Sequence, residues 1–483
     1  MWKVFSLMAV GIVAATAVAL VRPQTPAASR PNIVLVMSDD MGYADLSSYG
    51  ATDIKTPNID SLGRDGIRLT DFYANGVLCS PTRAGFINGR YQQRYLIDNV
   101  VGGTTPPLKI TGESLPQLLK NNGYATGLIG KWHLGSTVET GPRAHGFEYF
   151  FGFLGSHIDF YHHNRGPAAP DLWENDASVY PQFDGEYMTD LITSRSIRFI
   201  EQSAAASRPF FVDVAYNAPH WPYQPPGMPS PAPGTGAQQL PQQDNTATRA
   251  DYAAMVEAVD NGVGTILQTL ERLGLTNNTI VIFTNDNGGE WLSNGGPLFN
   301  RKWTTWEGGI RVPALVKWPG HIQPGRVSDQ VGITMDLSAS LVAVSGAAVP
   351  KDYDGINLFP ILEGRSPQVE RTLYWRTNVG NRSMRSVRNG DWKLVVDGNH
   401  IFVFNLRQDV SERNDLTYRR TDIANRLRPM LTKWEQDMDA EARVHFPELT
   451  TTPGAGAARG ARGTAPAPGA GRGGAAANPD PTD

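Results

Sequence analysis

Short apolar segments recur along the chain, and helix-compatible stretches lie between them. The apolar segments are Ile33–Met37, Ala125–Ile129, Phe210–Ala215 and Ile280–Thr284. Apolar runs of this length without strict alternation are typical of strands that are buried on both faces of a parallel sheet. The stretches with helical character are Ser114–Asn121, Met188–Ala204 and Asp251–Leu273. This alternation predicts an α/β fold in which helices cover both faces of a large, mostly parallel sheet.

The pattern changes from about Arg371 onward, where apolar and polar residues alternate over short runs. These runs are Thr372–Trp375, Met384–Arg388, Trp392–Val396 and Phe402–Asn405. Alternation with a period of two predicts a smaller antiparallel sheet, and a helix is expected from about Asp422 to Ala440. We therefore expect a large N-terminal domain at residues 30–368 and a C-terminal antiparallel-sheet subdomain at residues 369–449.

The first 29 residues have the pattern of an export signal. Lys3 precedes an apolar run from Val4 to Val21, which is followed by Arg22 and Pro23. We expect cleavage near Ala19 or Ala28 and a periplasmic or secreted protein. The apolar run is close to the length that spans a bilayer, so an uncleaved membrane anchor is the alternative.

Two further segments have too few apolar residues to form a core. Residues 222–245 are rich in Pro, Gly and Gln and predict a long surface loop. Residues 450–483 consist mainly of Gly, Ala, Pro and Arg, a composition that is typical of disorder.

Composition narrows the class of partner and draws attention to one residue. The net charge of −4 gives no overall attraction to nucleic acid or to an anionic membrane, so a small-molecule or glycan substrate is expected. The chain contains a single cysteine, Cys79, which cannot form a disulfide within an exported chain. Base rates favour a buried hydrophobic role, with a reactive group or its precursor as the alternatives.

Polar side chains follow each of the four predicted strands. The first strand ends in Asp39-Asp40, the second in Lys131-Trp-His133, the third leads to His220, and the fourth ends in Asp286-Asn287. Ligands of open parallel sheets bind at the carboxyl ends of the strands. We therefore expect these side chains to meet at one edge of the sheet.

The acidic residues of this edge indicate a metal site. Asp39, Asp40, Asp286 and Asn287 offer only hard oxygen ligands, which suit Ca²⁺ or Mg²⁺. The alternative is that Asp39-Asp40 caps a following helix while Asn287-Gly288 forms a turn. Two such pairs, each directly after a buried strand, favour the metal.

The basic residues and histidines are weaker signals when each is taken alone. Lys131 and His133 point the same way if the chain stays extended. His220 is equally compatible with a loop histidine that is held by aromatic packing, and Lys302 with a solvated lysine.

Cys79 lies where a helix is expected to begin. Pro81 suits the first turn of a helix that ends at Gly89. The amides and the dipole at such a terminus would lower the thiol pKa or help to hold an anionic substrate. Arg83 follows within about one helical turn and can reach the same anion.

The segment Cys79–Arg83, followed by Gly89-Arg90, resembles the Cys-x-Pro-x-Arg signature of the sulfatase family. Residues Gly123–Leu134 are similar to the second signature of that family. The resemblance extends from Asn32 to about Leu416, and Asn88 departs from the threonine that is usual in the extended signature. Two further segments, Trp306–Leu315 and Lys131–Gly135, are most similar to arylsulfatases and N-acetylgalactosamine-6-sulfatases.

The resemblance implies an alkaline-phosphatase-like fold and hydrolysis of a sulfated carbohydrate or an aryl sulfate. It also implies that a formylglycine-generating enzyme oxidises Cys79 to formylglycine (3-oxoalanine), whose hydrate is the nucleophile. By the same resemblance, Ca²⁺ binds Asp39, Asp40, Asp286, Asn287 and the modified Cys79, with Mg²⁺ as the alternative ion.

The resemblance further assigns roles to the basic residues and histidines. Arg83 and Lys131 would hold the charge of the diol and the sulfate. Lys302 and His220 would contact the sulfate and protonate the departing alcohol, while His133 would take a proton from the second hydroxyl.

Two other functions compete with this reading. A phosphate or phosphonate ester hydrolase of the same superfamily would commonly use two metals with several histidine ligands, whereas one oxygen-rich cluster is visible here. A catalytically dead glycan-binding homologue is disfavoured because no expected catalytic position is substituted. The candidates for substrate selection are His157–His163, Trp173, Trp221 and the loop beyond Pro222.

Overall fold

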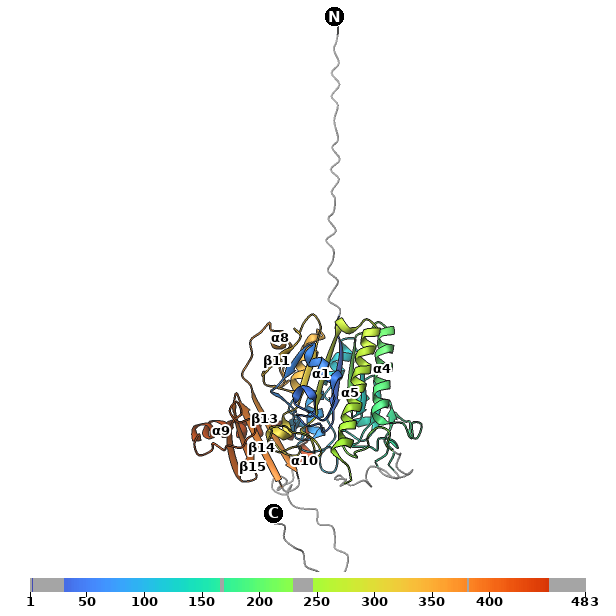
Figure 1. Cartoon of the computed structure of the whole chain (residues 1–483). Helices are drawn as coiled ribbons and strands as arrows, with labels where there is room; N and C mark the ends of the chain where they lie inside the picture. Colours follow the sequence, from blue (N-terminus) through green and yellow to red (C-terminus); the bar gives the residue numbers. More distant parts are fainter. Residues whose placement is uncertain (1, 3–29, 166–168, 229–245, 380–381, 451–483) are drawn as a thin grey trace, which may run out of the picture.

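The computed structural model describes residue 2 and residues 30–165, 169–228, 246–379 and 382–450 (Figure 1). The predicted signal segment and C-terminal tail, apart from one residue of each, lie outside these ranges, as do residues 229–245 of the predicted loop. Among the described residues, every helix is too short or too polar to cross a bilayer.

A ten-stranded sheet forms the centre of the larger part of the molecule, with strand order β11-β2-β10-β9-β1-β8-β4-β5-β6-β7. Its middle consists of parallel neighbours: β9 (Thr279–Asn285), β1 (Asn32–Ser38), β8 (Phe210–Ala215), β4 (Ala125–Lys131) and β5 (Tyr149–Phe153). The four predicted strands are thus confirmed as adjacent central strands. Every residue of β1, β4, β8 and β9 is buried, which explains their continuous apolar sequences.

Shorter strands complete both sides of the sheet and a small second pair. They are β2 (Ile67–Leu69), β10 (Ala314–Lys317), β11 (Arg326–Ser328), β6 (Trp173–Glu174) and β7 (Ala177–Ser178), with β3 (Phe72–Tyr73) pairing β12 (Gly332–Ile333). β10 is antiparallel to both β9 and β2, so the sheet is mixed.

Helices cover the two faces of this sheet. Val34 and Val36 of β1 pack in one hydrophobic cluster with residues of α1 (Pro57–Arg64), α4 (Met188–Ala205) and α5 (Arg249–Arg272). Ile33 and Leu35 pack in a second cluster with α2 (Cys79–Asn88), α3 (Leu115–Asn121) and α7 (Thr334–Val344). Because successive side chains of a strand face opposite sides, one strand serves both cores, and the α/β sandwich is confirmed.

The C-terminal part is a four-stranded antiparallel sheet packed against a long helix. Its strands are β13 (Thr372–Val379), β14 (Arg382–Asn389), β15 (Trp392–Asp397) and β16 (His400–Asn405), in that order, and the helix is α9 (Thr421–His445). Figure 1 shows this unit beside the large sheet. The short helices are α6 (Glu307–Ile310) before β10, α8 (Phe359–Leu362) before β13, and α10 (Pro447–Thr450) after α9. Short 3-10 turns are η1 (Ser47–Tyr49), η2 (Gln92–Tyr95), η3 (Val138–Thr140), η4 (Pro142–His145) and η6 (Thr276–Asn278).

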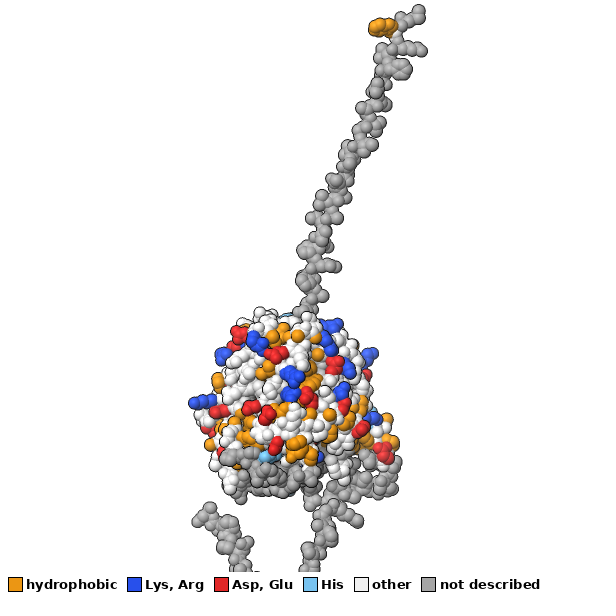
Figure 2. Space-filling view, turned by 90° about the vertical axis from the view of Figure 1, so that its right-hand side faces the viewer, with side chains coloured by type: hydrophobic (Ala, Val, Ile, Leu, Met, Phe, Trp, Pro, Cys, Tyr) orange, Lys and Arg blue, Asp and Glu red, His pale blue; other side chains and the backbone are white. Residues whose placement is uncertain are grey.

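The surface carries both signs of charge. On the face drawn in Figure 2, lysine and arginine side chains are interspersed with aspartate and glutamate. Such a mixture produces no extended field of one sign on that face.

Candidate active site

The carboxyl ends of β1 and β9 meet at one edge of the large sheet. Ser38 pairs with Asn285 in the register of the two strands, and the Ser38 hydroxyl donates to Asn285 Oδ1 at 2.9 Å. Just beyond the strands, the Asp40 amide faces Asp286 Oδ1 at 3.5 Å, and Asn287 Nδ2 donates to Asp40 Oδ1 at 2.8 Å. The two acidic segments therefore lie in contact, as their places after the strands predicted.

Asp39-Asp40 does not cap a helix. The backbone of Asp40 is left-handed, with φ 65°, and the next helical turn begins only at Ser47. The capping alternative is wrong because the chain turns back over the sheet edge at Asp40, which aims both carboxylates at the site.

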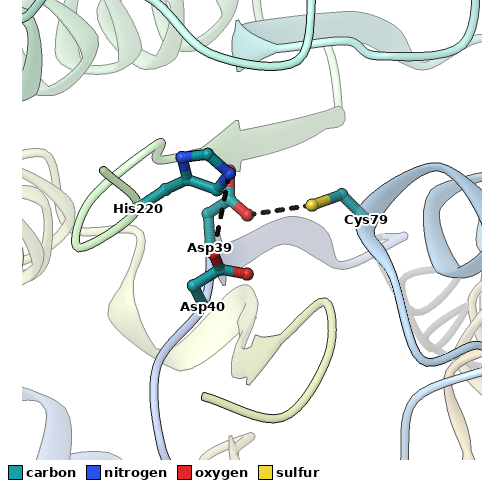
Figure 3. Close-up of side chains that lie close together, drawn as sticks. All are labelled: Asp39, Asp40, Cys79 and His220. Atoms are coloured by element: carbon teal, nitrogen blue, oxygen red, sulfur yellow. Dashed lines mark hydrogen bonds and ion pairs between the residues drawn. The ribbon is translucent and has the colours of Figure 1, made fainter. Parts of the chain in front are cut away.

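Cys79 joins these carboxylates from the start of α2 (Figure 3). Its Sγ lies 3.3 Å from Asp39 Oδ1, and ligand atoms of Asp39, Asp40, Cys79 and His220 all lie within 4.8 Å of one another. The helix begins at Cys79 and ends before Gly89, whose φ of 62° suits glycine. The predicted helix is confirmed.

The surroundings of the thiol do not lower its pKa. Burial raises the pKa of Cys79 well above the ordinary value, and the carboxylates of Asp286 and Asp39 add to this effect more than Lys131 and Lys302 oppose it. The prediction that the helix terminus lowers the pKa of the thiol is therefore wrong.

Three buried cations neutralise the three carboxylates. Lys131 Nζ bonds Asp39 Oδ2, and Lys302 Nζ lies 2.6 Å from Asp40 Oδ1. Arg83 contacts Asp286 Oδ2 through Nη2 at 2.9 Å and through Nε at 3.2 Å. Burial alone would lower the pKa of both lysines, but the carboxylates raise it, so both stay charged.

The carboxylates respond differently to this surrounding charge. Burial would raise the pKa of Asp40, but Lys302 above all outweighs it and holds that pKa at about 2. Burial and the nearby Asp39 charge raise the pKa of Asp286 to about 6, against the opposing effect of Arg83.

Both site histidines are neutral imidazoles. Burial lowers the pKa of His133 well below its ordinary value, with Lys131 and Arg83 adding to the effect. Burial likewise lowers the pKa of His220 to about 3, although its Nε2 is only 3.5 Å from Asp40 Oδ2. The Nδ1 of His220 lies 2.6 Å from the Trp221 carbonyl oxygen, which can only accept, so Nδ1 carries the proton.

The chain does not stay extended from Lys131 to His133. His133 has φ 58°, so the predicted alternation of side chains along an extended strand is wrong at this point. Both side chains are nevertheless buried, and the charge of Lys131 acts on His133. The Nδ1 of His133 has no hydrogen-bond partner among the described residues.

Asn287 tests whether these residues fit a cation. Its Nδ2 donates to Asp40 and to the Gly288 carbonyl, but its buried Oδ1 has no hydrogen-bond partner within the described ranges. A buried acceptor without a donor is costly, and an amide oxygen is a usual ligand of hard cations. Asp39, Asp40, Asp286 and Asn287 thus fit Ca²⁺ or Mg²⁺.

These observations coincide with a family match. Residues 31–347 match the family model Sulfatase, and residues 296–437 match the model described as N-sulphoglucosamine sulphohydrolase, C-terminal. The chain belongs to the sulfatase family. This sulfatase is therefore a sulfuric ester hydrolase, and its fold is alkaline-phosphatase-like.

Named relatives agree with this placement. The sulfatase is 36% identical to N-acetylgalactosamine-6-sulfatase of Canis lupus familiaris over 371 residues, which cover 72% of this chain and 68% of the relative. It is 32% identical to arylsulfatase A of Homo sapiens, covering 75% and 74% of the two chains. The solved structure of Ps i-CgsB in complex with k-i-k-neocarrahexaose is 30% identical, with a TM-score of 0.75 over 84% of this chain and 93% of that chain.

Only part of the aromatic segment proposed for substrate selection approaches this site of the sulfatase. The His157 ring lies 4.4 Å from the Trp221 ring and 6.4 Å from the His220 ring, measured between centroids. In contrast, Asp159 accepts hydrogen bonds from two backbone amides and from Gln224 and thereby braces its own loop. Trp173 donates to the buried Asp171 and packs on the core.

Sequence reasoning missed two residues that support the site. Ser80 accepts from the Val101 amide at 3.0 Å and donates to the His133 carbonyl at 2.8 Å, so it ties α2 to the histidine segment. Glu290 is buried near Asp40 and accepts from Trp303 Nε1 at 2.8 Å. The position of Glu290 three residues after Asn287 was the available signal, but nothing in the sequence indicated its burial.

Proposed function

We propose that this sulfatase removes sulfate from a sulfated carbohydrate or an aryl sulfate, using formylglycine made from Cys79 and a bound Ca²⁺. The observation that carries the proposal is the position of Cys79 Sγ, 3.3 Å from Asp39 Oδ1 and 3.7 Å from Lys302 Nζ. A raised thiol pKa makes Cys79 a poor nucleophile as it stands, which favours its conversion into another group. The names of the relatives support the substrate class.

Charge balance supports a divalent cation. Asp39, Asp40 and Asp286 supply three negative charges, while Arg83, Lys131 and Lys302 supply three positive charges. The site alone is thus neutral and has little net attraction for an anionic ester. A divalent cation leaves two positive charges, which match a sulfate monoester and an ionised nucleophile.

The oxygen ligands favour Ca²⁺ over Mg²⁺. Asp39, Asp40, Asp286 and Asn287 would hold the ion, and the irregular set of two segments suits the flexible coordination of Ca²⁺. When bound, such an ion acts as a Lewis acid that polarises the ester and lowers the pKa of an adjacent hydroxyl.

Formylglycine supplies a hydrated aldehyde, whose second hydroxyl permits release of sulfate that an ordinary serine could not achieve. The chain's own residues then position charge and protons. Arg83 and Lys131 hold the negative charge of the diol and the sulfate, because both cations are buried beside the nucleophile position. His133 accepts a proton there, since it is neutral and its Nδ1 has no partner in the described structure.

Lys302 and His220 face the leaving group. Lys302 is charged and, like His220, lies against the Asp40 carboxylate, so in the proposed complex its ammonium would donate a hydrogen bond to the ester oxygen. Lys302 supplies the proton to the departing alcohol, and the neutral His220 offers its unprotonated Nε2 as a hydrogen-bond acceptor beside it. The predicted export signal supports a periplasmic or secreted location, reached after a formylglycine-generating enzyme has acted.

The test compares protein made with and without a formylglycine-generating enzyme. Mass analysis of the peptide Val77–Arg90 should show an aldehyde only in the first sample. That sample should release sulfate from a panel of sulfated saccharides and 4-nitrophenyl sulfate. Cys79→Ala should lower kcat/KM by roughly 10³-fold or more, because the nucleophile is lost.

One control makes this result decisive. Circular dichroism should show that the Cys79→Ala protein is folded, since the substitution removes one buried sulfur atom. Retention of full sulfate release by folded Cys79→Ala would refute the proposal.

A further inference from the structure

The segment Asn300–Trp303 is held against the active site, and its backbone is left-handed at both ends, which is common for asparagine but not for tryptophan. Asn300 has φ 65° and Trp303 has φ 79°, and a positive φ is uncommon for a bulky residue. The Lys302 amide donates to the Gly289 carbonyl, and the Trp303 amide donates to the Val77 carbonyl, both at 3.1 Å. The segment is thus tied both to the acidic loop and to the approach to Cys79. The left-handed backbone of Trp303 persists because these contacts hold it, and such outliers cluster at functional sites.

Glu290 fixes the side chains of this segment. It is buried, and its Oε2 accepts the indole N–H of Trp303 at 2.8 Å. Its Oε1 lies 3.8 Å from Arg301 Nε, which is too long for a hydrogen bond. Glu290 therefore holds Trp303 firmly and Arg301 only loosely.

Arg301 is the outward-facing neighbour of Lys302. Its side chain is 48% exposed, and its guanidinium makes no hydrogen bond to any residue that the structure describes. Consecutive Cα atoms are about 3.8 Å apart, so Arg301 starts beside the residue that reaches Cys79. The charges of Lys302, Arg301 and Asp40 all affect the pKa of the buried Tyr223. Arg301 therefore lies within electrostatic reach of the site.

We propose that Arg301 is a specificity-determining residue that binds a second anionic group of the substrate, on the sugar that carries the cleaved sulfate or on its neighbour. The inference rests on the proposed function and deepens it. A planar guanidinium with five donors matches the paired oxygens of a sulfate or a carboxylate. An aryl sulfate without a second charge leaves this arginine unused, so the substrate class is a polyanionic saccharide.

The experiment uses matured enzyme and matched substrate pairs. One arm compares hexosamine 6-sulfates with their disulfated counterparts, and the other compares monosulfated disaccharides with and without a uronate carboxylate. The readout is the ratio of kcat/KM within each pair, from sulfate release. Wild type should favour the more anionic member of at least one pair, and Arg301→Gln should reduce that ratio by about tenfold, because a charge-assisted contact is lost. The responding arm distinguishes sulfate from carboxylate.

Two variants control the measurement. Arg301→Lys keeps the charge without the planar fork and should retain part of the preference. Arg272→Gln removes a similarly exposed arginine, which pairs with Glu201 instead, and should leave every ratio unchanged. Thermal unfolding of each variant verifies the fold.

The outcomes separate the two proposals. Sulfate release with no preference in wild type, or with ratios that Arg301→Gln leaves unchanged, would overturn the role of Arg301 alone. Failure of matured wild type to release sulfate from any substrate would reject the proposed function, and the inference with it.

Discussion

At the scale of single residues, Asn287 is the strongest indication of a bound cation. Its Nδ2 is committed to Asp40 and Gly288, which leaves a buried oxygen without a donor among the described residues. Asp286 stands beside it with both a contact to Arg83 and a raised pKa, as a carboxylate does when its compensating charge is insufficient. A hard divalent ion would both coordinate the unpaired oxygen of Asn287 and compensate the charge of Asp286.

Asp286→Ala should therefore abolish calcium binding. The substitution removes a carboxylate ligand and leaves the buried Arg83 without its partner. Elemental analysis should show stoichiometric calcium in wild type and almost none in the variant. Asp53→Ala, which changes an exposed carboxylate that pairs with Arg249, should retain calcium. Full calcium in folded Asp286→Ala would contradict the assigned ligands.

The residues that meet here were accessible from the sequence because each follows a buried strand or opens a helix. Their mutual charges were not accessible, since pairing depends on distances across the sheet edge. Lys302, for example, looks like any solvated lysine in the sequence, yet it is buried against Asp40. The helix at Cys79 was predicted, whereas the raised thiol pKa required knowledge of Asp39 and Asp286.

At the scale of elements, β8 carries an unusual core residue. Asp213 is buried between its neighbours β1 and β4, and its Oδ1 has no hydrogen-bond partner in the described structure. Burial raises the pKa of Asp213 to about 7, against a smaller opposing effect of Arg83. The fold therefore prefers the protonated carboxyl.

Asp213→Asn should stabilise the protein at pH 8 and change little at pH 4. Below pH 4 both folded and unfolded chains keep the proton, so the residue costs nothing. Between about pH 4 and pH 7 only the unfolded chain loses the proton, and stability falls as pH rises. The variant avoids this penalty, which is on the order of 2–4 kcal/mol. Unfolding temperatures at the two pH values measure the difference, and an equal shift at both would contradict the assignment.

Four of the five central strands and the long helices were predicted well because their apolar patterns are continuous, whereas β5 was missed. The short strands β2, β6, β7, β10 and β11 were not predicted. They have two to four residues each, and pairing with a neighbour defines them more than their own composition does.

At the scale of the whole molecule, a buried ion network joins the C-terminal sheet to the active-site edge. Lys393 of β15 lies 2.7 Å from Glu307 Oε1 and 2.9 Å from Glu412 Oε1. Glu307 begins α6, and the Gly309 carbonyl of that helix accepts the amide of Gly288 at 3.0 Å. The C-terminal sheet thus supports the loop that carries Asp286 and Asn287.

Lys393→Met should destabilise the protein by roughly 3–5 kcal/mol, because it leaves the buried Glu412 without a cation and Glu307 with Arg311 alone. It should also weaken calcium binding through α6. Lys433→Met is the matched control, since Lys433 is exposed and its helical pair with Asp437 contributes little. Thermal unfolding with and without calcium measures both effects. Equal unfolding temperatures for the two variants would show that the network is dispensable.

The burial of α2 determines when Cys79 can be modified. All ten residues of this helix, Cys79 included, are inaccessible once the chain has folded. A modifying enzyme must take the segment as an extended peptide, so under the proposed function it acts before folding. Oxidation of Cys79 and folding of the chain then compete kinetically, and each molecule follows one course or the other. A chain that folds first stays permanently inactive, and no later supply of the modifying enzyme can rescue it.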